Sequence, residues 1–177
     1  MKQWAEIRKR WWAFQLKRKM ANPLPVLPWK GWNAARSIGI VFDAREEESL
    51  ERLRLWLPRW KAQGKVVKLL GYIGQRRPKN SLFSGRQIFY TDDLDWNGAP
   101  SAGDALEFSQ TEFDVVINLD PNPGSATVYV LAHTKSAVRV GPTGAANFYT
   151  LMMPMGSAPW EVLLTEMESY LSKISPA

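Results

Sequence analysis

The sequence predicts an α/β fold, a Rossmann-like three-layer sandwich in which helices cover both faces of a mainly parallel sheet. The first observation is an alternation, from Ser37 onward, of short apolar runs with segments of helical periodicity. The second is size, because 177 residues with 45% hydrophobic content suffice for one well-packed core. Alternating strands and helices indicate parallel pairing, since each parallel connection needs a crossover, which is usually a helix.

Residues 1–36 are predicted to form an extension, a basic Trp-rich helix followed by a Pro-rich strap, and residues 37–177 the Rossmann-like domain. Apolar residues spaced three and four apart predict a helix over residues 3–20. They are Trp4, Ile7, Trp11 and Phe14. Three prolines between residues 22 and 32 exclude a helix there and favour an extended strap.

The elements of the domain follow in order along the chain. Strands are expected over residues 37–43, 65–74, 88–90, 113–119, 137–141 and 148–153. Helices are expected between Asp43 and Gly64, within 101–110, from about Gly124 to Lys135, and along an apolar face from Trp160 to Ile174. Pro58 should kink or break the first of these helices, and Gly64 should end it.

Composition and motifs exclude several chemistries. Cysteine is absent and histidine occurs once, which excludes disulfides, thiolate nucleophiles, cysteine-ligated metals and multi-histidine metal sites. The turn after the first strand lacks glycine and carries Glu46, Glu47 and Glu48, so it does not match the dinucleotide fingerprint. We therefore expect no cofactor, no metal and no catalytic residue, and a binding protein rather than an enzyme, with enzymatic activity left open.

Two polar segments are candidates for a ligand site. Their residues are Asn118, Asp120, Asn122, Gly141, Thr143 and Gly144. The first three end a strand and could meet a small polar ligand or a cation, or they are turn formers that bond to their own backbone. The last three belong to the loop 141–147, which could present backbone amides to an anion or could be a plain flexible loop.

Two other polar features are expected to be structural. Asp92, Asp93 and Asp95 resemble the start of a calcium loop, but its later ligands do not follow, so a solvated turn is expected. His133 lies late in a helix of small residues, where it would interact with the helix C-terminus or form a partly buried hydrogen bond. Neither feature predicts catalysis.

The N-terminal extension is the main functional lead, because residues 1–36 carry nine Lys and Arg and one Glu. Aromatic residues interleave with these charges, and they are Trp4, Trp11, Trp12, Phe14, Trp29 and Trp32. Phosphate neutralisation plus stacking is typical of sequence-tolerant RNA binding. The predicted nucleic-acid-binding residues are Arg8, Lys9, Arg10, Trp11, Lys17, Arg18 and Lys19. Alternatively, the apolar stripe packs on the domain or on a dimer partner.

Two resemblances add expectations. Residues 113–141, a strand with a polar turn, a small-residue helix and a strand ending in RVG, are similar to part of the N-terminal Rossmann half of heptosyltransferases. That resemblance implies a Rossmann fold and, by extension, glycosyl transfer. With its Trp-rich leader, its FDVVINLD strand and its closing helix, the whole chain resembles an uncharacterised family of small Bacteroidota proteins with a domain of unknown function. That resemblance implies a bacterial, cytoplasmic protein.

The predicted function is therefore non-catalytic binding of a polyanion, RNA or the ribosome, by the basic aromatic extension. One alternative is a small-ligand-binding or glycosyltransferase-like protein that uses Asn118, Asp120 and Asn122 at the carboxyl ends of the strands. A second is a peripheral protein on an anionic membrane surface, against which the scattered basic residues argue. The sequence shows no secretory signal and no apolar run long enough to span a membrane.

Overall fold

The computed structural model describes residues 2–21, 27–45, 47–77, 88–96, 98–144, 149–155 and 159–176. One six-stranded, all-parallel sheet has the order β3-β2-β1-β4-β5-β6. The strands are β1 (Ser37–Asp43), β2 (Val66–Tyr72), β3 (Ile88–Phe89), β4 (Glu112–Asn118), β5 (Lys135–Pro142) and β6 (Leu151–Met153). The helices are α1 (Lys2–Ala21), α2 (Glu47–Ala62), α3 (Gly103–Gln110), α4 (Ser125–His133) and α5 (Trp160–Lys173), and a 3-10 turn, η1, covers Thr91–Asp93. The predicted Rossmann-like sandwich is confirmed.

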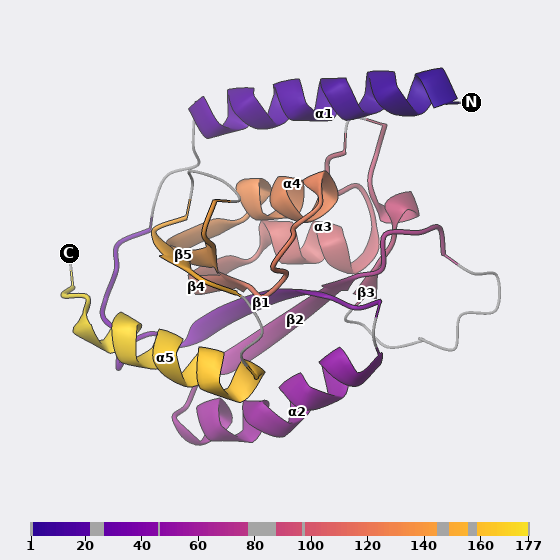
Figure 1. Ribbon diagram of the computed structural model, residues 1–177. Helices are drawn as coiled ribbons and strands as arrows, with labels where there is room; N and C mark the ends of the chain where they lie inside the picture. Colours follow the sequence, from indigo (N-terminus) through magenta and orange to yellow (C-terminus); the bar gives the residue numbers. More distant parts are fainter. Residues whose placement is uncertain are drawn as a thin grey trace.

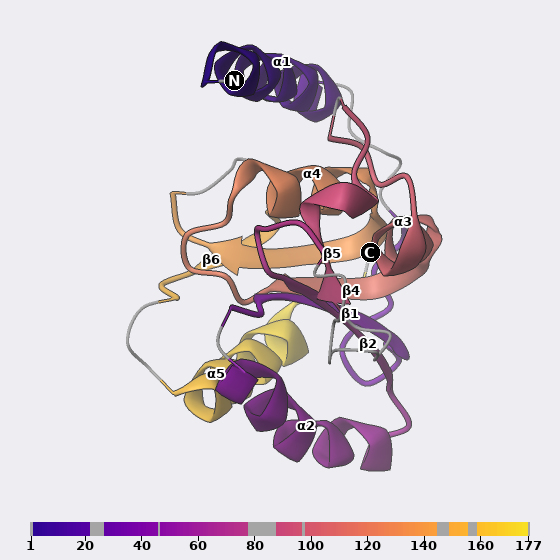
Figure 2. The ribbon, with the colours of Figure 1, turned by 90° about the vertical axis from the view of Figure 1, so that its right-hand side faces the viewer.

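The layers are seen most directly in Figure 1 and in the rotated view of Figure 2. Helices α3 and α4 cover one face of the sheet, and α2 and α5 cover the other. Helix α1 lies outside this sandwich and packs on α4, so it forms a further layer on that side. None of the described helices is both long and apolar enough to cross a membrane.

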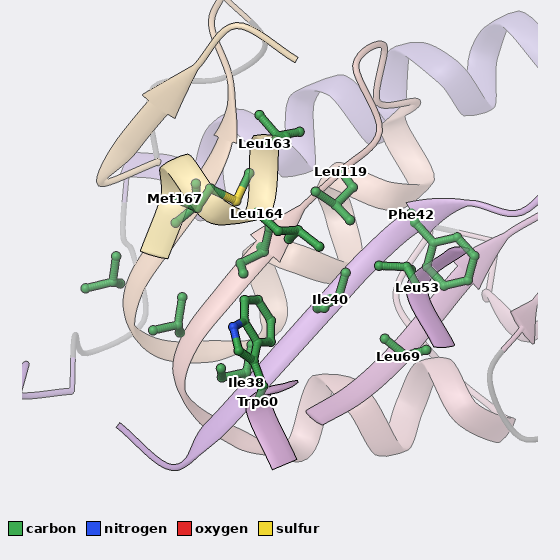
Figure 3. Packing of buried hydrophobic residues seen from close by; sticks show 14 of the residues in the cluster. Ile38, Ile40, Phe42, Leu53, Trp60, Leu69, Leu119, Leu163, Leu164 and Met167 are labelled. Atoms are coloured by element: carbon green, nitrogen blue, oxygen red, sulfur yellow. The ribbon is translucent and has the colours of Figure 1, made fainter. Parts of the chain in front are cut away.

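The hydrophobic core consists of two clusters, one on each face of the sheet. Strand β1 contributes to both, with Ile38 and Ile40 facing α2 and α5 and Val41 facing the α3 and α4 side. This explains why its sequence is apolar almost throughout, since a central parallel strand is covered on both faces. Trp60 of α2 is fully buried in the first cluster, as Figure 3 shows.

Helix α2 continues through Pro58 to Ala62, so the expected break at Pro58 is wrong, while the expected kink stays a prediction. Proline removes one backbone hydrogen bond from a helix, here the one to the carbonyl of Arg54, and Arg54 and Pro58 both lie on the exposed side of α2. The fully buried side chains of Leu53 and Trp60 hold the helix to the core on both sides of the proline. Gly64, with a φ of 75°, follows the end of the helix as predicted.

The second half of the strap belongs to the core of the domain. Trp29 and Trp32 are 6% and 4% exposed, and the Trp29 indole donates a 3.1 Å hydrogen bond to the carbonyl of Ile174. The buried ammonium of Lys65 donates to the carbonyls of Trp32 and Ala35 at 2.7 and 3.0 Å. Burial lowers the pKa of Lys65. Trp29 and Trp32 were expected to offer stacking surfaces to RNA, and that expectation is wrong because both rings are enclosed.

Candidate functional site

The strand order creates a switch point between β1 and β4. From β1 the chain continues to β2 on one side, whereas β4, on the other side of β1, continues outward to β5. In open parallel sheets, ligands bind outside the carboxyl ends of the strands at such a point. Asp43 ends β1, Asn118 ends β4, and Asp120 follows two residues later. The first predicted ligand segment therefore lies at the switch point.

Hydrogen bonds show how these polar residues are arranged. The side-chain oxygen of Asn118, a fully buried residue, accepts from the backbone amide of Asp120 at 3.1 Å. One carboxylate oxygen of Asp120 accepts from the amide of Asn122 at 2.9 Å. These are the local turns expected from the structural alternative. Asn118 and Asp120 are buried, whereas Asn122 is exposed, so the three side chains do not share one environment.

Tyr149 links the two predicted ligand segments. Its hydroxyl accepts a 2.7 Å hydrogen bond from the side-chain amide of Asn118, and its ring lies directly on Gly141. Burial raises the pKa of Tyr149 to about 12, so the hydroxyl is protonated at neutral pH. This role could not be predicted from the sequence, which places Tyr149 in a strand over residues 148–153, whereas β6 begins at Leu151. Thr143 and Gly144 are exposed at the start of the loop, and residues 145–148 lie outside the described residues.

The two carboxyl groups at the switch point have opposite electrostatic environments. Burial raises the pKa of Asp120, and the nearby charge of Asp43 raises it further, against the Asn122 amide and Arg45. Hydrogen bonds from the Arg45 guanidinium lower the pKa of Asp43. The switch point therefore holds an ion pair between Asp43 and Arg45, and beside it the Asp120 carboxyl group, whose charged form is disfavoured. Such a carboxyl group is suited to hydrogen bonding with a hydroxyl-bearing ligand.

The Asp120→Asn variant should melt at a higher temperature than the wild type at neutral pH. Because the folded state raises the pKa of Asp120, the unfolded chain loses its proton first as the pH rises above 3.8. Folding stability then falls until the folded-state pKa is passed. Asparagine keeps an oxygen for the Asn122 amide and cannot ionise. Thermal unfolding at a series of pH values should show the difference shrinking toward zero in acid.

Asp43→Asn is the matched control, with the opposite sign. The pKa of Asp43 is lowered in the folded state, so its contribution to stability is present above 3.8 and is lost as the pH falls through the folded-state value. This variant should melt below the wild type at neutral pH and converge with it in acid. Equal, pH-independent differences for both variants would contradict the assigned environments.

The structure corrects the expected solvated turn at Asp93, whereas Asp92 is exposed as expected. Asp93 is buried, pairs with Arg77 at 2.9 Å and accepts from the amide of Tyr90 at 2.9 Å, so it organises the loop after β3. Within the described residues, no group of three or more acidic or histidine side chains could hold a metal ion. His133 is partly buried, with its Nδ1 2.8 Å from the carbonyl oxygen of Tyr129, which agrees with the expected structural role.

A cleft of about 320 Å³ lies near the amino end of β1, between residues 30–34 and 172–176. Its charged lining residues are Lys30 and Lys173, and none of the predicted ligand-binding or nucleic-acid-binding residues lines it. This cleft therefore does not belong to either predicted site.

Helix α1 presents three residues of the predicted apolar stripe to solvent, and the side chain of the fourth, Trp4, lies outside those described. Ile7 and Phe14 are each 57% exposed and Trp11 is 38% exposed, so the alternative in which the whole stripe packs on the domain is wrong for Ile7 and Phe14. Leu16, which lies off the stripe, is half-buried. The reason is that α1 contacts α4 with a different side, and this choice depends on tertiary packing and not on the spacing of apolar residues alone.

Basic side chains lie on the same exposed side of α1. Arg10, Lys17 and Arg18 are exposed together with Trp11, whereas the side chains of Arg8, Lys9 and Lys19 lie outside those described. At about 100° per residue, Arg18 lies between Ile7 and Trp11 around the helix axis. Four of the seven predicted nucleic-acid-binding residues are thus placed on one accessible surface.

Trp96 extends this surface from a distant part of the chain. It is 68% exposed, and its ring stacks on that of Trp11 with centroids 5.6 Å apart and an interplanar angle of 21°. The Phe14 ring lies 5.9 Å from Trp11 on the same helix. The three rings, called here the aromatic row, are Phe14, Trp11 and Trp96. The contact of Trp96 with Trp11 could not be predicted from the sequence, because it depends on where α1 docks.

The turn that carries Trp96 is held by several hydrogen bonds. The amide of Asp95 donates to the carbonyl of Ala99 at 2.9 Å, and the Asp95 carboxylate accepts from the Ala99 amide at 2.8 Å. The Gly98 amide donates to the carbonyl of Asp95 at 3.0 Å, and Gly98 has a φ of 87°, which favours glycine. The exposed Trp96 is thus flanked by hydrogen-bonded backbone groups of Asp95, Gly98 and Ala99.

Comparison with known proteins identifies a family without an assigned activity. No curated protein and no solved structure gives a significant match. The family model described as a family of unknown function (DUF6913) matches residues 8–174, which include most of α1 and the whole sheet. The extension and the domain are therefore matched as one unit, and the chain belongs to the DUF6913 family of unknown function.

Proposed function

We propose that this protein is a non-catalytic binding protein that takes single-stranded RNA, free or on the ribosome surface, along α1 and Trp96. The observation that carries the proposal is the aromatic row, Phe14, Trp11 and Trp96, exposed beside basic side chains. Stacking rings and positive charges are the two components with which proteins bind single strands without reading their sequence.

The row is suited to unpaired bases. Its ring centroids are 5.9 and 5.6 Å apart, and each of the three side chains keeps more than a third of its surface exposed. Exposed aromatic rings of this size normally cover themselves in a core, because each buries a large apolar area. Here a hydrogen-bonded turn and a docked helix hold them in solvent. Bases of any identity can stack on such rings, since every base has a π-face.

Charge provides the second component. Residues 2–21 contain seven Lys and Arg and one Glu, and Arg10, Lys17 and Arg18 are exposed next to the row. Phosphate contacts release counterions, so the slope of log affinity against log salt is about −0.7 per contact for single strands. Three contacts from these residues would give a slope of about −2.

RNA is favoured over a membrane surface by the position of Arg18. A helix that lies in a membrane interface keeps its basic residues opposite an apolar face that enters the lipid. Around the helix axis Arg18 points in the direction of the apolar stripe, one turn beyond Phe14, where lipid immersion would have to bury its charge. Beside bases and phosphates the same arginine is well placed, because guanidinium groups both stack and bind phosphate.

The test is fluorescence anisotropy with a labelled single-stranded oligouridine and the full chain. Trp96→Ala and Trp11→Ala should each weaken binding by about tenfold, the effect expected from losing one stacked base. Arg18→Gln should weaken binding less and make the salt slope shallower by about 0.7. Tyr170→Ala is the matched control, because Tyr170 is 49% exposed and lies beside Lys173 on α5, across the sheet from α1.

Unchanged affinity in Trp96→Ala, or an equal loss in Tyr170→Ala, would contradict the proposal. If the wild type floats with anionic vesicles and does not bind RNA, and if Trp96→Ala and Trp11→Ala abolish the flotation, the membrane surface is favoured instead. A cytoplasmic location stays a prediction.

A second candidate function is recognition of a small ligand at the carboxyl ends of the strands. The observation that favours it is the placement of buried Asn118 and Asp120 at the switch point. The local resemblance of residues 113–141 to heptosyltransferases would make that ligand a sugar or nucleotide sugar. The test is to measure the melting temperatures of the wild type and the Asp120→Asn variant with and without a panel of such compounds. The candidate fails if no compound raises the melting temperature of either protein.

A further inference from the structure

The cleft near the amino end of β1 is formed by two segments that are far apart in the sequence. One wall is the turn at residues 30–34, between the strap and β1, and the other is the end of α5 with the residues that follow it, 172–176. Its volume of about 320 Å³ lies within the range of small-molecule sites, about 300–1,000 Å³. The cleft is therefore large enough to hold a small molecule.

Several contacts hold the two walls of the cleft together. The indole of Trp29 donates a 3.1 Å hydrogen bond to the carbonyl of Ile174. Pro176 packs against Gly31, where an added Cβ would lie 3.3 Å from the proline ring. Gly31 also has a φ of 84°, and its carbonyl accepts from the amide of Ala34 at 3.1 Å. The cleft is thus shaped by backbone that is already in place, as most small-molecule sites are.

The backbone of the turn presents a donor on the side away from the core. The carbonyl of Trp32 accepts from the buried ammonium of Lys65 at 2.7 Å. In a trans peptide the carbonyl and the following amide point in opposite directions, so the amide of Asn33 points away from Lys65. Within the described residues this amide has no hydrogen-bond acceptor. Asn33 also lines the cleft, so the turn offers an amide to a ligand there.

The lining of the cleft carries a positive charge. Its charged residues are Lys30 on one wall and Lys173 on the other, and the remaining polar lining residues are Asn33, Ser172 and Ser175. Lys173 lies in the last turn of α5, where the helix dipole places about half a negative charge. That half charge offsets only part of two ammonium groups. An anionic ligand is therefore favoured over a neutral or cationic one.

The acidic side chains in this region are engaged elsewhere. Glu168 pairs with Arg59 at 3.2 Å, and Asp114 accepts from the backbone amide of Arg36 at 2.7 Å. Neither carboxylate lines the cleft. Within the described part of the chain, Lys30 and Lys173 form no salt bridge. The charge of the two lysines is thus available to a ligand.

We propose that this cleft binds the phosphate group of a small molecule, with the ammonium groups of Lys30 and Lys173 and the amide of Asn33 as its donors. Lysine binds phosphate as a point charge, whereas carboxylates are best matched by the planar fork of arginine. Backbone amides in turns bind phosphate as well. The cleft shares no residue with the RNA surface on α1 or with the switch point, so the inference goes beyond the proposed function and does not rest on it.

The experiment measures binding to the full chain by calorimetry with two probes, inorganic phosphate and glucose 6-phosphate. Neither probe carries a base that could stack on the aromatic row. Lys30→Gln and Lys173→Gln should each weaken binding of both probes by about tenfold, the effect of losing one charged hydrogen bond. Both lysines are exposed, so the two variants should fold like the wild type.

Two further variants make the result specific to the cleft. Lys61→Gln is the matched control, because it removes the same charge from an exposed position on α2 that does not line the cleft, and it should leave binding unchanged. Ala34→Phe enlarges an exposed side chain of the lining without changing the charge. It should weaken binding of glucose 6-phosphate more than binding of inorganic phosphate, because the larger probe needs more of the volume.

The proposal is overturned if the wild type binds neither probe at millimolar concentration, or if binding is unchanged in both Lys30→Gln and Lys173→Gln. An equal loss in Lys61→Gln would show that only the overall charge of the protein matters, and a loss in Trp11→Ala would move the binding to the RNA surface. Either result also contradicts the proposal. Tighter binding of glucose 6-phosphate would assign the cleft to a phosphorylated small molecule, and equal binding of the two probes would assign it to phosphate itself.

Discussion

Trp60→Ala is expected to destabilise the protein by about 3–5 kcal/mol, the usual effect of truncating a buried tryptophan. Trp60 is fully buried and connects three parts of the chain. Its ring packs edge-on against Trp32 of the strap, with centroids 5.6 Å apart, and its indole nitrogen lies 3.5 Å from the carboxylate of Glu168 on α5. Losing it therefore loosens α2, α5 and the strap together.

Urea unfolding of the wild type and the variant measures this effect. Equal slopes m would show that the two proteins expose the same amount of surface on unfolding. Leu55→Ala is the matched control on the same helix, because Leu55 is 80% exposed and its truncation should change stability by less than about 0.5 kcal/mol. Similar losses in the two variants would show that α2 does not pack through Trp60.

Gly141→Ala is the second large effect, with an expected loss of about 3 kcal/mol. A Cβ at this position would lie 2.2 Å from the ring of Tyr149, which is far inside van der Waals contact. The ring has little freedom to withdraw, since it is buried and its hydroxyl is bonded to Asn118. Overfilled cores cost about 1–3 kcal/mol and occasionally more.

Thermal unfolding should show a melting temperature lower by about 10 °C for a chain of this size. Gly124→Ala is the control, because nothing lies within 4 Å of the added atom and its φ of −67° suits any residue. In the double variant Gly141→Ala with Tyr149→Leu, part of the loss should return. If the single variant Gly141→Ala has the same melting temperature as the wild type, the ring of Tyr149 does not lie against Gly141.

The central elements of the fold could be predicted because their signals are local. The apolar run of residues 37–43 and the periodic apolar face from Trp160 onward each determine one element without reference to the rest of the chain. The break expected at Pro58 does not occur, because the burial of Leu53 and Trp60 on either side outweighs the lost hydrogen bond and the steric cost of the proline ring. Tertiary packing can therefore override the low helix propensity of a single residue.

The sites were harder to predict, because they combine residues distant in sequence. Asn118 and Asp120 could be named from the end of their strand, but Tyr149, which bonds to Asn118 from 31 residues away, could not. Trp11 could be named from the basic helix, whereas Trp96 joins it only through the docking of α1 on α4. Trp29 and Trp32 carried the same sequence signal as Trp11 and proved to be core residues.

The two edge strands of the sheet have a consequence for how this protein can associate. Strand β3 comprises two residues and β6 three, and both pair in parallel with their inner neighbours. Long exposed edges invite further strands and lead to aggregation, and very short edges are one means by which proteins avoid this. A strand that added to β3 or β6 would find only two or three residues to pair with. Strand addition at these two strands is therefore expected to contribute little to association through the described part of the chain.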